Sequence, residues 1–418
     1  MMSRCVYLIQ NLTPVILLFT GIVAAFKFPQ KLGVRSLVGF YAARFVFIVA
    51  SMHYLGLGSA DLDGWWMHAK WMADGGCFPG KDFSSPYHLG FNLLLFASVK
   101  LWHSPYSIVL VFTLAELIAV VVMFEALKNI IPIVKLKSAI ILFLMSPIGF
   151  ASALATQDES LLLLGVAALL LVAITESWKW VGFLVAFVGV LISKIFAPFF
   201  LLPVALLRSW TGAFVVVCAV VVYWILACLV GINPFEIKFA RDIGINNIGN
   251  FDDIMAFSTF GNIWKPLSIN PCFAVKTFAA TMIGVSCLVF LRRDEMHDIR
   301  KYDKIESMLG MITLMMFAFI TFYPMTFFTY VVPSLPFMYL MLLLKEKNIM
   351  LGVSLFMFTS WQILLRYDPS ASSFVRAHEQ LVELIYFGCL SYLIVRCLYL
   401  YRREILSCMK SWGFYNRD

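Results

Sequence analysis

The sequence has few charged residues and contains no long polar segment that could fold as a separate soluble domain. Of its 418 residues, 13% are charged and 61% are hydrophobic, whereas a soluble domain has about 25% charged residues. The apolar residues form runs that approach the roughly 20 residues needed to cross a bilayer. We therefore expect one integral membrane domain over 1–418, acting as a monomer, with membrane lipid as its main partner.

Nucleotide-binding and hydrolase motifs are missing as well. The sequence has no P-loop, no GxGxxG after a strand, no GxSxG and no HExxH. The loops also leave no room for a cytosolic phosphate cradle, so an activated substrate would be lipid-borne and would approach from within the membrane. The net charge of +8 is divided among short patches between apolar runs, which indicates membrane anchoring and no nucleic acid partner.

The cysteines give little sign of metal or redox chemistry. The nine cysteines include no CxxC pair and no Cys/His cluster, so no metal site is expected from them. Most lie inside apolar runs, where a thiol usually serves as a small packing residue. Cys77 and Cys272 lie in the two long polar loops, and a disulfide between them would need an oxidising compartment.

The hydrophobic runs predict an all-α polytopic membrane protein with about 11–13 transmembrane helices. Residues 6–26 lack a small-residue cleavage site and are followed by basic residues, so we expect a retained helix rather than a signal peptide. The candidate crossings are 6–26, 37–58, 106–127, 139–155, 157–176, 180–193, 194–207, 212–231, 273–291, 305–321, 325–344, 348–365 and 379–400.

Short loops rich in lysine and arginine predict which face is cytoplasmic. These loops are 27–36, 128–137, 292–304, 345–347 and the C-terminal tail with Arg402, Arg403 and Lys410. The two long polar loops, 59–89 and 232–272, then lie on the extracytoplasmic face and are expected to carry short interfacial helices. The short apolar run 90–103 must not cross if 128–137 is cytoplasmic, so we predict a re-entrant or interfacial segment there.

Two carboxylates, Asp61 and Asp63, stand at the mouth of a membrane helix, where lipid offers them no partner. If this stretch is helical, Asp61, Trp65 and Ala69 fall on one face at spacing i, i+4 and i+8. Indole rings suit the membrane interface, so the stretch predicts a carboxylate beside an aromatic ring in the outer leaflet. The plainer alternative is a solvated loop with an aromatic belt.

A second candidate segment is the Gly- and Pro-rich stretch 75–88, which predicts a tight irregular turn. Its Lys81 and His88 side chains are candidate contacts for an anionic group. The alternative is an ordinary surface turn with a solvated lysine.

Further polar groups interrupt apolar sequence. Gln157, Asp158 and Glu159 lie between two apolar runs, and facing lipid would cost them several kcal/mol. We expect them to face a cavity, with a short hydrated turn as the alternative. Lys194 either reaches the interface along its stem or pairs with a phosphate, and Arg241 in the second loop matches phosphate geometry best.

In chain order, these features resemble the GT-C superfamily of membrane glycosyltransferases. They are most similar to its polyprenyl-phosphate-sugar-dependent members, such as GPI mannosyltransferase I and the bacterial polyprenol-phosphate-mannose mannosyltransferases. The matching segments are Asp61 with Trp65 and Ala69; Gly75, Pro79 and Tyr87; Ser146-Pro147 before Gln157-Asp158-Glu159-Ser160; Lys194-Ile195-Phe196-Ala197-Pro198; and Thr329-Tyr330-Val331-Val332-Pro333. Departures such as Trp65 for tyrosine and His88-Leu89 for a double proline leave the acceptor open.

The resemblance implies a GT-C-like catalytic module over 37–210 and variable helices over 211–418. It implies inverting transfer from a polyprenyl-phosphate-linked sugar donor to a glycan or glycolipid acceptor, on the periplasmic or extracellular face of a bacterial inner membrane. A divalent cation is allowed, although no ligand cluster requires one. The implied catalytic residues are Asp61 and Asp63. The implied phosphate contacts are Lys81, His88, Lys194 and Arg241. The implied sugar contacts are Trp65, Tyr87, Gln157, Asp158 and Glu159.

Two other functions stay open. A lipid-linked oligosaccharide polymerase or ligase would rest on Arg and His in a long late loop, whereas the acids here come early. A transporter or flippase predicts inverted repeats and charges near mid-membrane. The sequence shows no repeat, but Arg44, Glu116 and Lys276 are intramembrane charges that either sit near helix ends or pair within the bundle.

Overall fold

The computed structural model describes residues 2–56, 59–79, 81–83, 85, 87, 89–174 and 328–345, together with nine separate positions between 214 and 309. Within these residues every regular element is helical, apart from one isolated bridge between Pro79 and Phe83. The second long loop, and the predicted crossings after residue 176 other than 325–344, lie largely outside the described residues.

Two of the described helices are long and apolar enough to cross a membrane: α2 (Val34–Leu55) and α5 (Tyr106–Leu127). The bounds of α5 are those that its hydrophobic run predicts, and α2 begins at Val34 rather than at residue 37. In lipid the backbone must satisfy its own hydrogen bonds, and a continuous helix does so without outside partners. The described part of the chain is therefore an all-helical protein with helices of membrane-spanning length.

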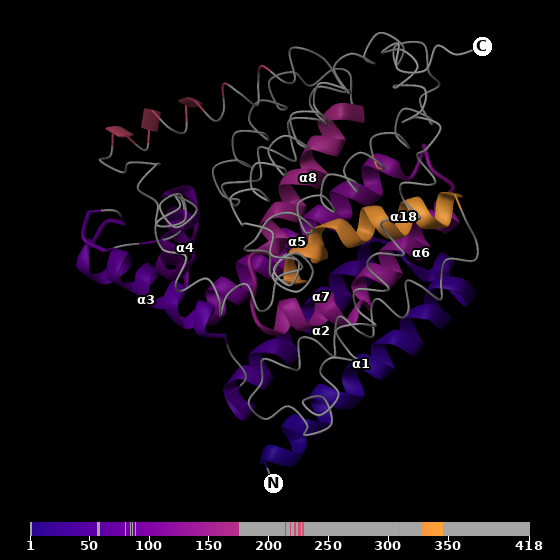
Figure 1. Ribbon diagram of the computed structural model, residues 1–418, viewed down its shortest axis with the longest axis horizontal. Helices are drawn as coiled ribbons and strands as arrows, with labels where there is room; N and C mark the ends of the chain where they lie inside the picture. Colours follow the sequence, from indigo (N-terminus) through magenta and orange to yellow (C-terminus); the bar gives the residue numbers. More distant parts are fainter. Residues whose placement is uncertain are drawn as a thin grey trace, which may run out of the picture.

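The N-terminal helix α1 (Met2–Lys27) packs along α6 (Ile133–Leu144) and belongs to the bundle (Figure 1). The buried hydroxyl of Ser138 donates to the carbonyl of Ala25 at 2.6 Å and ties the two helices together. The helix expected over 6–26 is thus present.

The predicted single crossing 139–155 is wrong in detail. The structure has two helices here, α6 and α7 (Pro147–Leu154), which are bent by 48° and make one span only if they are counted together. The break has a local cause, because Pro147 at the first turn of α7 has no N–H to continue α6. Ser146 caps the new helix, and its Oγ accepts the N–H of Gly149 at 3.4 Å.

Three further elements complete the described bundle. Helix α8 (Glu159–Ile174) follows its predicted run and packs along α5. The run 325–344 predicts one crossing helix, and this prediction is wrong in detail. The structure has a 3-10 segment, η3 (Phe328–Ser334), followed by the helix α18 (Leu335–Lys345). Pro333 lies inside η3, and its missing N–H prevents a regular α-helix at that point. Helix α18 packs against α6 (Figure 1).

Helices α2 and α5 are antiparallel. Arg44 in α2 pairs with Glu116 in α5, and His53, near the end of α2, lies 3.3 Å from the hydroxyl of Tyr106 at the start of α5. The end of α2 and the start of α5 therefore lie at the same end of the bundle. The intervening residues make no net crossing, as the charge bias required.

Two of the loops predicted to be cytoplasmic, 27–36 and 128–137, meet at the opposite end, beside the last turn of α18. Lys137 Nζ donates to the carbonyl of Gln30 at 3.2 Å, next to the 3-10 turn η1 (Pro29–Lys31). Lys135 Nζ donates to the carbonyl of Leu344 at 3.3 Å. The turn that follows α1, the start of α6 and the end of α18 thus lie on one face.

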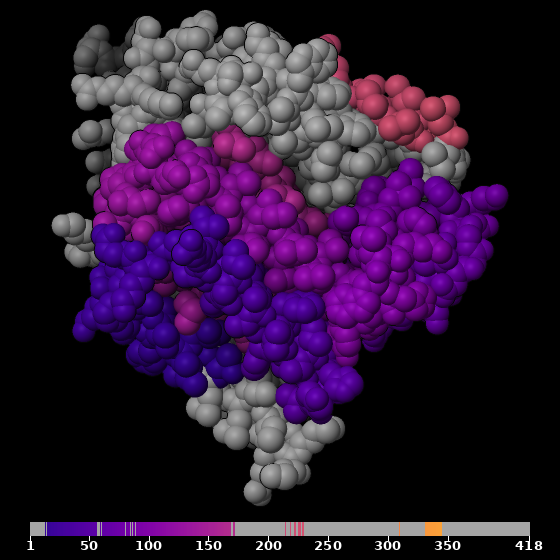
Figure 2. Space-filling view, turned by 180° about the vertical axis from the view of Figure 1, so that it is seen from behind, coloured from indigo at the N-terminus to yellow at the C-terminus, as the bar shows by residue number. Residues whose placement is uncertain are grey.

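Between α2 and α5 the chain forms a separate helical pair, α3 (Ala60–Gly75) and α4 (Leu89–Leu101). The pair projects beside the main bundle in both views (Figures 1 and 2). With 13 residues, α4 is shorter than the roughly 20 residues of a full crossing. This agrees with the short, non-crossing segment predicted at 90–103.

Candidate active site

Helix α3 begins with two acids, and N-capping and the helix dipole explain in part why acids occur at this helix start. Ser59 is the N-cap, and its Oγ accepts the N–H of Leu62 at 3.1 Å. Asp61 and Asp63 lie in the first turn, where a carboxylate interacts favourably with the helix dipole. Both acids are exposed, whereas Leu62 between them is buried.

Asp61 is joined to the other acidic segment of the sequence. Gln157 Nε2 donates to Asp61 Oδ2 at 3.0 Å, across 96 positions of the chain. Among the described residues, Oδ1 of Asp61 has no hydrogen-bond partner, so one oxygen is oriented and the other is free to accept a proton. In the same part of the chain, the Asp63 side chain makes no hydrogen bond or ion pair. The structure therefore distinguishes the two acids.

The C-terminal turn of α7 positions Gln157. The N–H of Thr156 donates to the carbonyl of Ala153 at 3.0 Å, and that of Gln157 to the carbonyl of Ser152 at 2.9 Å. These two bonds form a Schellman motif, in which glycine usually occupies the left-handed position. Here Thr156 occupies it, with φ 52°. A non-glycine residue in this conformation costs on the order of 1–3 kcal/mol.

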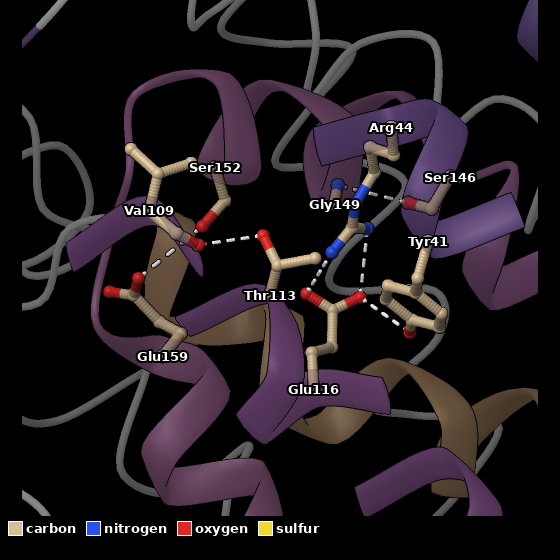
Figure 3. Close-up of polar contacts among 9 residues, drawn as sticks. All are labelled: Tyr41, Arg44, Val109, Thr113, Glu116, Ser146, Gly149, Ser152 and Glu159. Carbon is tan, nitrogen blue, oxygen red and sulfur yellow. Dashed lines mark hydrogen bonds and ion pairs between the residues drawn. The ribbon is translucent and has the colours of Figure 1, made fainter. Parts of the chain in front are cut away.

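Asp158 and Glu159 lie inside the protein, with only 3% and 1% of their surfaces exposed. The Oγ of Ser152 donates to Glu159 Oε2 at 3.3 Å (Figure 3). Their burial excludes a hydrated turn for these two, but the expectation that all three residues face a cavity is met by Gln157 alone, because neither acid lines the hollow described below. Gln157 remains half-buried at the edge of the same segment.

A narrow, partly open hollow lies beside Gln157, between α2, α5, the α7–α8 turn and η3. Its enclosed part is small, about 20 Å³, which is room for about one water-sized group. Its walls combine apolar side chains, including Val109 and Phe112, with a cluster of polar ones. The polar lining residues are Arg44, Thr113, Glu116, Ser152, Thr156, Gln157 and Ser160. Asp61 thus contacts this hollow through Gln157.

A buried ion pair forms one wall of the hollow (Figure 3). Arg44 donates through its two terminal nitrogens to both oxygens of Glu116, at 2.9 and 2.6 Å. Tyr41 donates to Glu116 Oε1 at 2.9 Å. For Arg44 and Glu116 the sequence left two possibilities, a position near the helix ends or pairing within the bundle. The structure confirms the pairing. Sequence reasoning singled out Arg44 and Glu116 only as intramembrane charges.

Trp65 is buried rather than presented on the outside of α3. Its ring, 2% exposed, makes edge contacts with Tyr87, Phe91 and Phe112 at centroid distances of 5.8, 5.6 and 5.4 Å. Tyr87 also stacks on Phe91 at 4.6 Å. These contacts hold α3 and α4 against α5, which favours a packing role for Trp65 in this state.

The predicted phosphate contacts are not assembled by the described residues. Lys81 is exposed in the turn closed by the bond from the Phe78 N–H to Asp82 Oδ2 at 2.6 Å. The other three, His88, Lys194 and Arg241, lie outside the described residues, as does Cys272, while Cys77 is a free thiol. No group of three His, Cys, Asp or Glu residues suited to a metal ion occurs in the part of the chain that the structure describes.

In the described residues, the fold and the site define a helical bundle with two helices long and apolar enough to span a membrane and an acid-bearing helix pair at one end. No family model matches the sequence, and no curated protein matches it. A solved structure, ArnT from Cupriavidus metallidurans bound to undecaprenyl phosphate, is similar in fold, with a TM-score of 0.48 and 14% identity. The alignment covers 90% of this chain and 74% of that chain.

Proposed function

We propose that this protein is an inverting glycosyltransferase that moves a sugar from a polyprenyl-phosphate donor to a glycan or glycolipid acceptor on the extracytoplasmic face. The proposal rests first on the resemblance to the GT-C superfamily in the order of its motifs. The observation that carries it furthest is the hydrogen bond between Gln157 and Asp61. It joins two of the segments on which that resemblance depends.

The placement of this bond also supports the proposal. Asp61 and Gln157 lie at the end of the bundle opposite the basic loops around Gln30, Lys137 and Leu344. Cationic loops are typical of the cytoplasmic face, so this arrangement favours an extracytoplasmic site. Such a site would meet lipid-linked donors at the membrane surface.

The chemistry follows from the free carboxylate oxygen. In the proposed reaction the acceptor hydroxyl oxygen attacks the anomeric carbon, and the bond from that carbon to the phosphate oxygen breaks. The polyprenyl phosphate leaves with the electron pair, and the hydroxyl proton moves to Asp61. A positioned base contributes about 10²–10⁴-fold to such a step. Gln157 orients the carboxylate, so that Oδ1 can receive the proton.

The test is a reconstitution assay on the purified full-length protein. Vesicles would contain the protein and a radiolabelled polyprenyl-phosphate sugar, with candidate glycolipid acceptors supplied on one or both faces. Formation of a labelled, acid-stable glycosidic product supports the transferase. Movement of intact donor across the bilayer without a new bond would instead indicate a flippase. Extension of one lipid-linked chain by another would indicate a polymerase or ligase.

A further inference from the structure

The hollow beside Gln157 holds several polar groups that have no partner. Arg44 Nε, Thr156 Oγ1 and Ser160 Oγ are all buried without a hydrogen bond to any described residue. The three residues are 5%, 2% and 7% exposed, and all three line the hollow. An unsatisfied buried polar group costs about 1–3 kcal/mol. Three such groups around one space indicate a polar occupant.

Thr156 gives an independent sign of a ligand. Glycine is the residue that its left-handed turn position favours, yet the chain places a β-branched residue there at φ 52°. Strain of this kind concentrates at functional sites. Because the Thr156 hydroxyl makes no bond to a described residue, the strained side chain gives the turn no local hydrogen bond in return.

The charges around the hollow indicate the class of occupant. The Arg44 guanidinium would be the obvious anion ligand, but both of its terminal nitrogens bind Glu116. Glu159 is not a lining residue, and its carboxylate accepts a hydrogen bond from Ser152, which is one. Among the described lining residues, the buried groups without a partner are one N–H and two hydroxyls. Each Thr156 or Ser160 hydroxyl can both donate and accept, as a sugar hydroxyl does, whereas an ionised phosphate can only accept, so the set matches a neutral sugar better.

We propose that this hollow is the subsite that recognises a hydroxyl group of the transferred sugar, through Thr156, Ser160 and Arg44 Nε. The proposal rests on the proposed transferase function and names the part of its substrate that enters the hollow. Because the enclosed part of the hollow has room for about one water-sized group, it receives a single hydroxyl of the sugar, and the ring itself stays outside. Gln157 lies in the same wall, so a sugar held here is next to the Asp61 carboxylate.

The experiment measures binding without turnover. Saturation-transfer NMR would be recorded on the full-length detergent-solubilised protein with the methyl glycosides of mannose, glucose and galactose. Thr156→Gly removes the hydroxyl and relieves the turn, so this variant should melt no lower than wild type. Thr156→Ser restores a hydroxyl. Ser107→Ala is the matched control, because Ser107 Oγ is also buried and unpartnered but does not line the hollow.

We expect at least one methyl glycoside to bind wild type, Thr156→Ser and Ser107→Ala, with binding weakened about fivefold in Thr156→Gly and in Ser160→Ala. Inorganic phosphate at the same concentration should not displace it. Three results would overturn the proposal: no glycoside binds wild type; binding is equal in all variants, so that the polar groups hold only water; or phosphate displaces the sugar. If the protein is not a transferase, the reconstitution assay gives no glycosidic product. That result is independent of whether a methyl glycoside binds in the hollow.

Discussion

Gln157 donates a hydrogen bond to the Asp61 carboxylate at 3.0 Å and so connects the start of α3 to the turn between α7 and α8. The Schellman bonds of the α7 terminus fix the backbone of Gln157, so the orientation of Asp61 depends on a rigid turn in the bundle. The second oxygen, Oδ1, has no partner among the described residues and would face the acceptor hydroxyl in the proposed reaction. Gln157 is thus a positioning residue for the proposed base.

Substitution of Gln157 tests that relationship. Gln157→Ala removes one hydrogen bond, which is worth about 1 kcal/mol, so we expect kcat to fall by roughly fivefold to tenfold with little change in KM. Gln157→Glu places a like charge beside Asp61 and should lower kcat further. If Gln157 had a purely structural role, both variants would melt at a lower temperature and kcat would not fall in the order wild type, Gln157→Ala, Gln157→Glu. Steady-state kinetics and thermal unfolding in detergent would distinguish the two cases.

The buried pair of Arg44 and Glu116 predicts a strongly non-additive stability effect. Arg44→Met or Glu116→Leu alone leaves one charge buried without its partner, and each should destabilise the protein by about 3–5 kcal/mol. The double variant removes both charges and should be more stable than Arg44→Met. Thermal unfolding of wild type, the two single variants and the double variant in one detergent gives the double-mutant cycle. Additive losses would show that the two side chains do not pair.

The close approach of α1 to the α6–α7 bend predicts opposite effects at two helical glycines. A Cβ on Gly21 would lie 2.6 Å from Met145 Cβ, whereas one on Gly39 would meet nothing within 4 Å. Gly39→Ala should therefore stabilise slightly, because alanine favours a helix by about 1 kcal/mol. Gly21→Ala should destabilise by about 1–3 kcal/mol through overpacking. Equal melting temperatures for the two variants would place α1 away from Met145.

His68 predicts a pH dependence of the α3–α4 pair. Burial lowers the pKa of the His68 imidazole from its ordinary value, because the charged ring loses solvation; the ring stacks on Phe83 at 4.8 Å. The neutral ring favours the folded state, so its contribution is complete above the unfolded pKa of about 6.5. It is lost as the pH falls through the lower folded pKa.

Amide hydrogen exchange would check this prediction. Protection factors in α3 and α4 should decrease on acidification below about pH 6, and His68→Phe should weaken that dependence. An unchanged profile in His68→Phe would exclude the ring as the cause.

Long apolar runs and loop charges predicted the features that depend on composition alone. The bounds of α5 and the absence of a net crossing by α4 follow from run length. The gathering of basic loops around Lys135 and Lys137 follows from charge bias. The cost of exposing an acid to lipid led us to expect Asp158 and Glu159 at a cavity; both are buried, but neither lines the hollow. Each of these outcomes is dictated by lipid as a solvent.

Other features depend on contacts between distant segments. The Ser146-Pro147 dipeptide is typical of a new helix start and could have predicted the bend. A hydropathy average over the whole run does not detect it. The partner of Arg44 is 72 positions away and follows from the antiparallel packing of α2 and α5. The burial of Trp65 depends on α4 and α5, whose aromatic side chains cover a ring that looked interfacial. Nothing in the sequence marks Thr156 as a residue of the hollow, because composition and periodicity do not reveal a left-handed backbone conformation.

The central claim is that Asp61 accepts the proton in sugar transfer. Its most direct test compares Asp61→Asn with Asp63→Asn, two nearly isosteric changes in one helical turn, in the reconstitution assay with equal amounts of folded protein. We predict that Asp61→Asn lowers the transfer rate by about 10²–10⁴-fold and that Asp63→Asn lowers it far less. Transfer by Asp61→Asn at the wild-type rate would contradict the account.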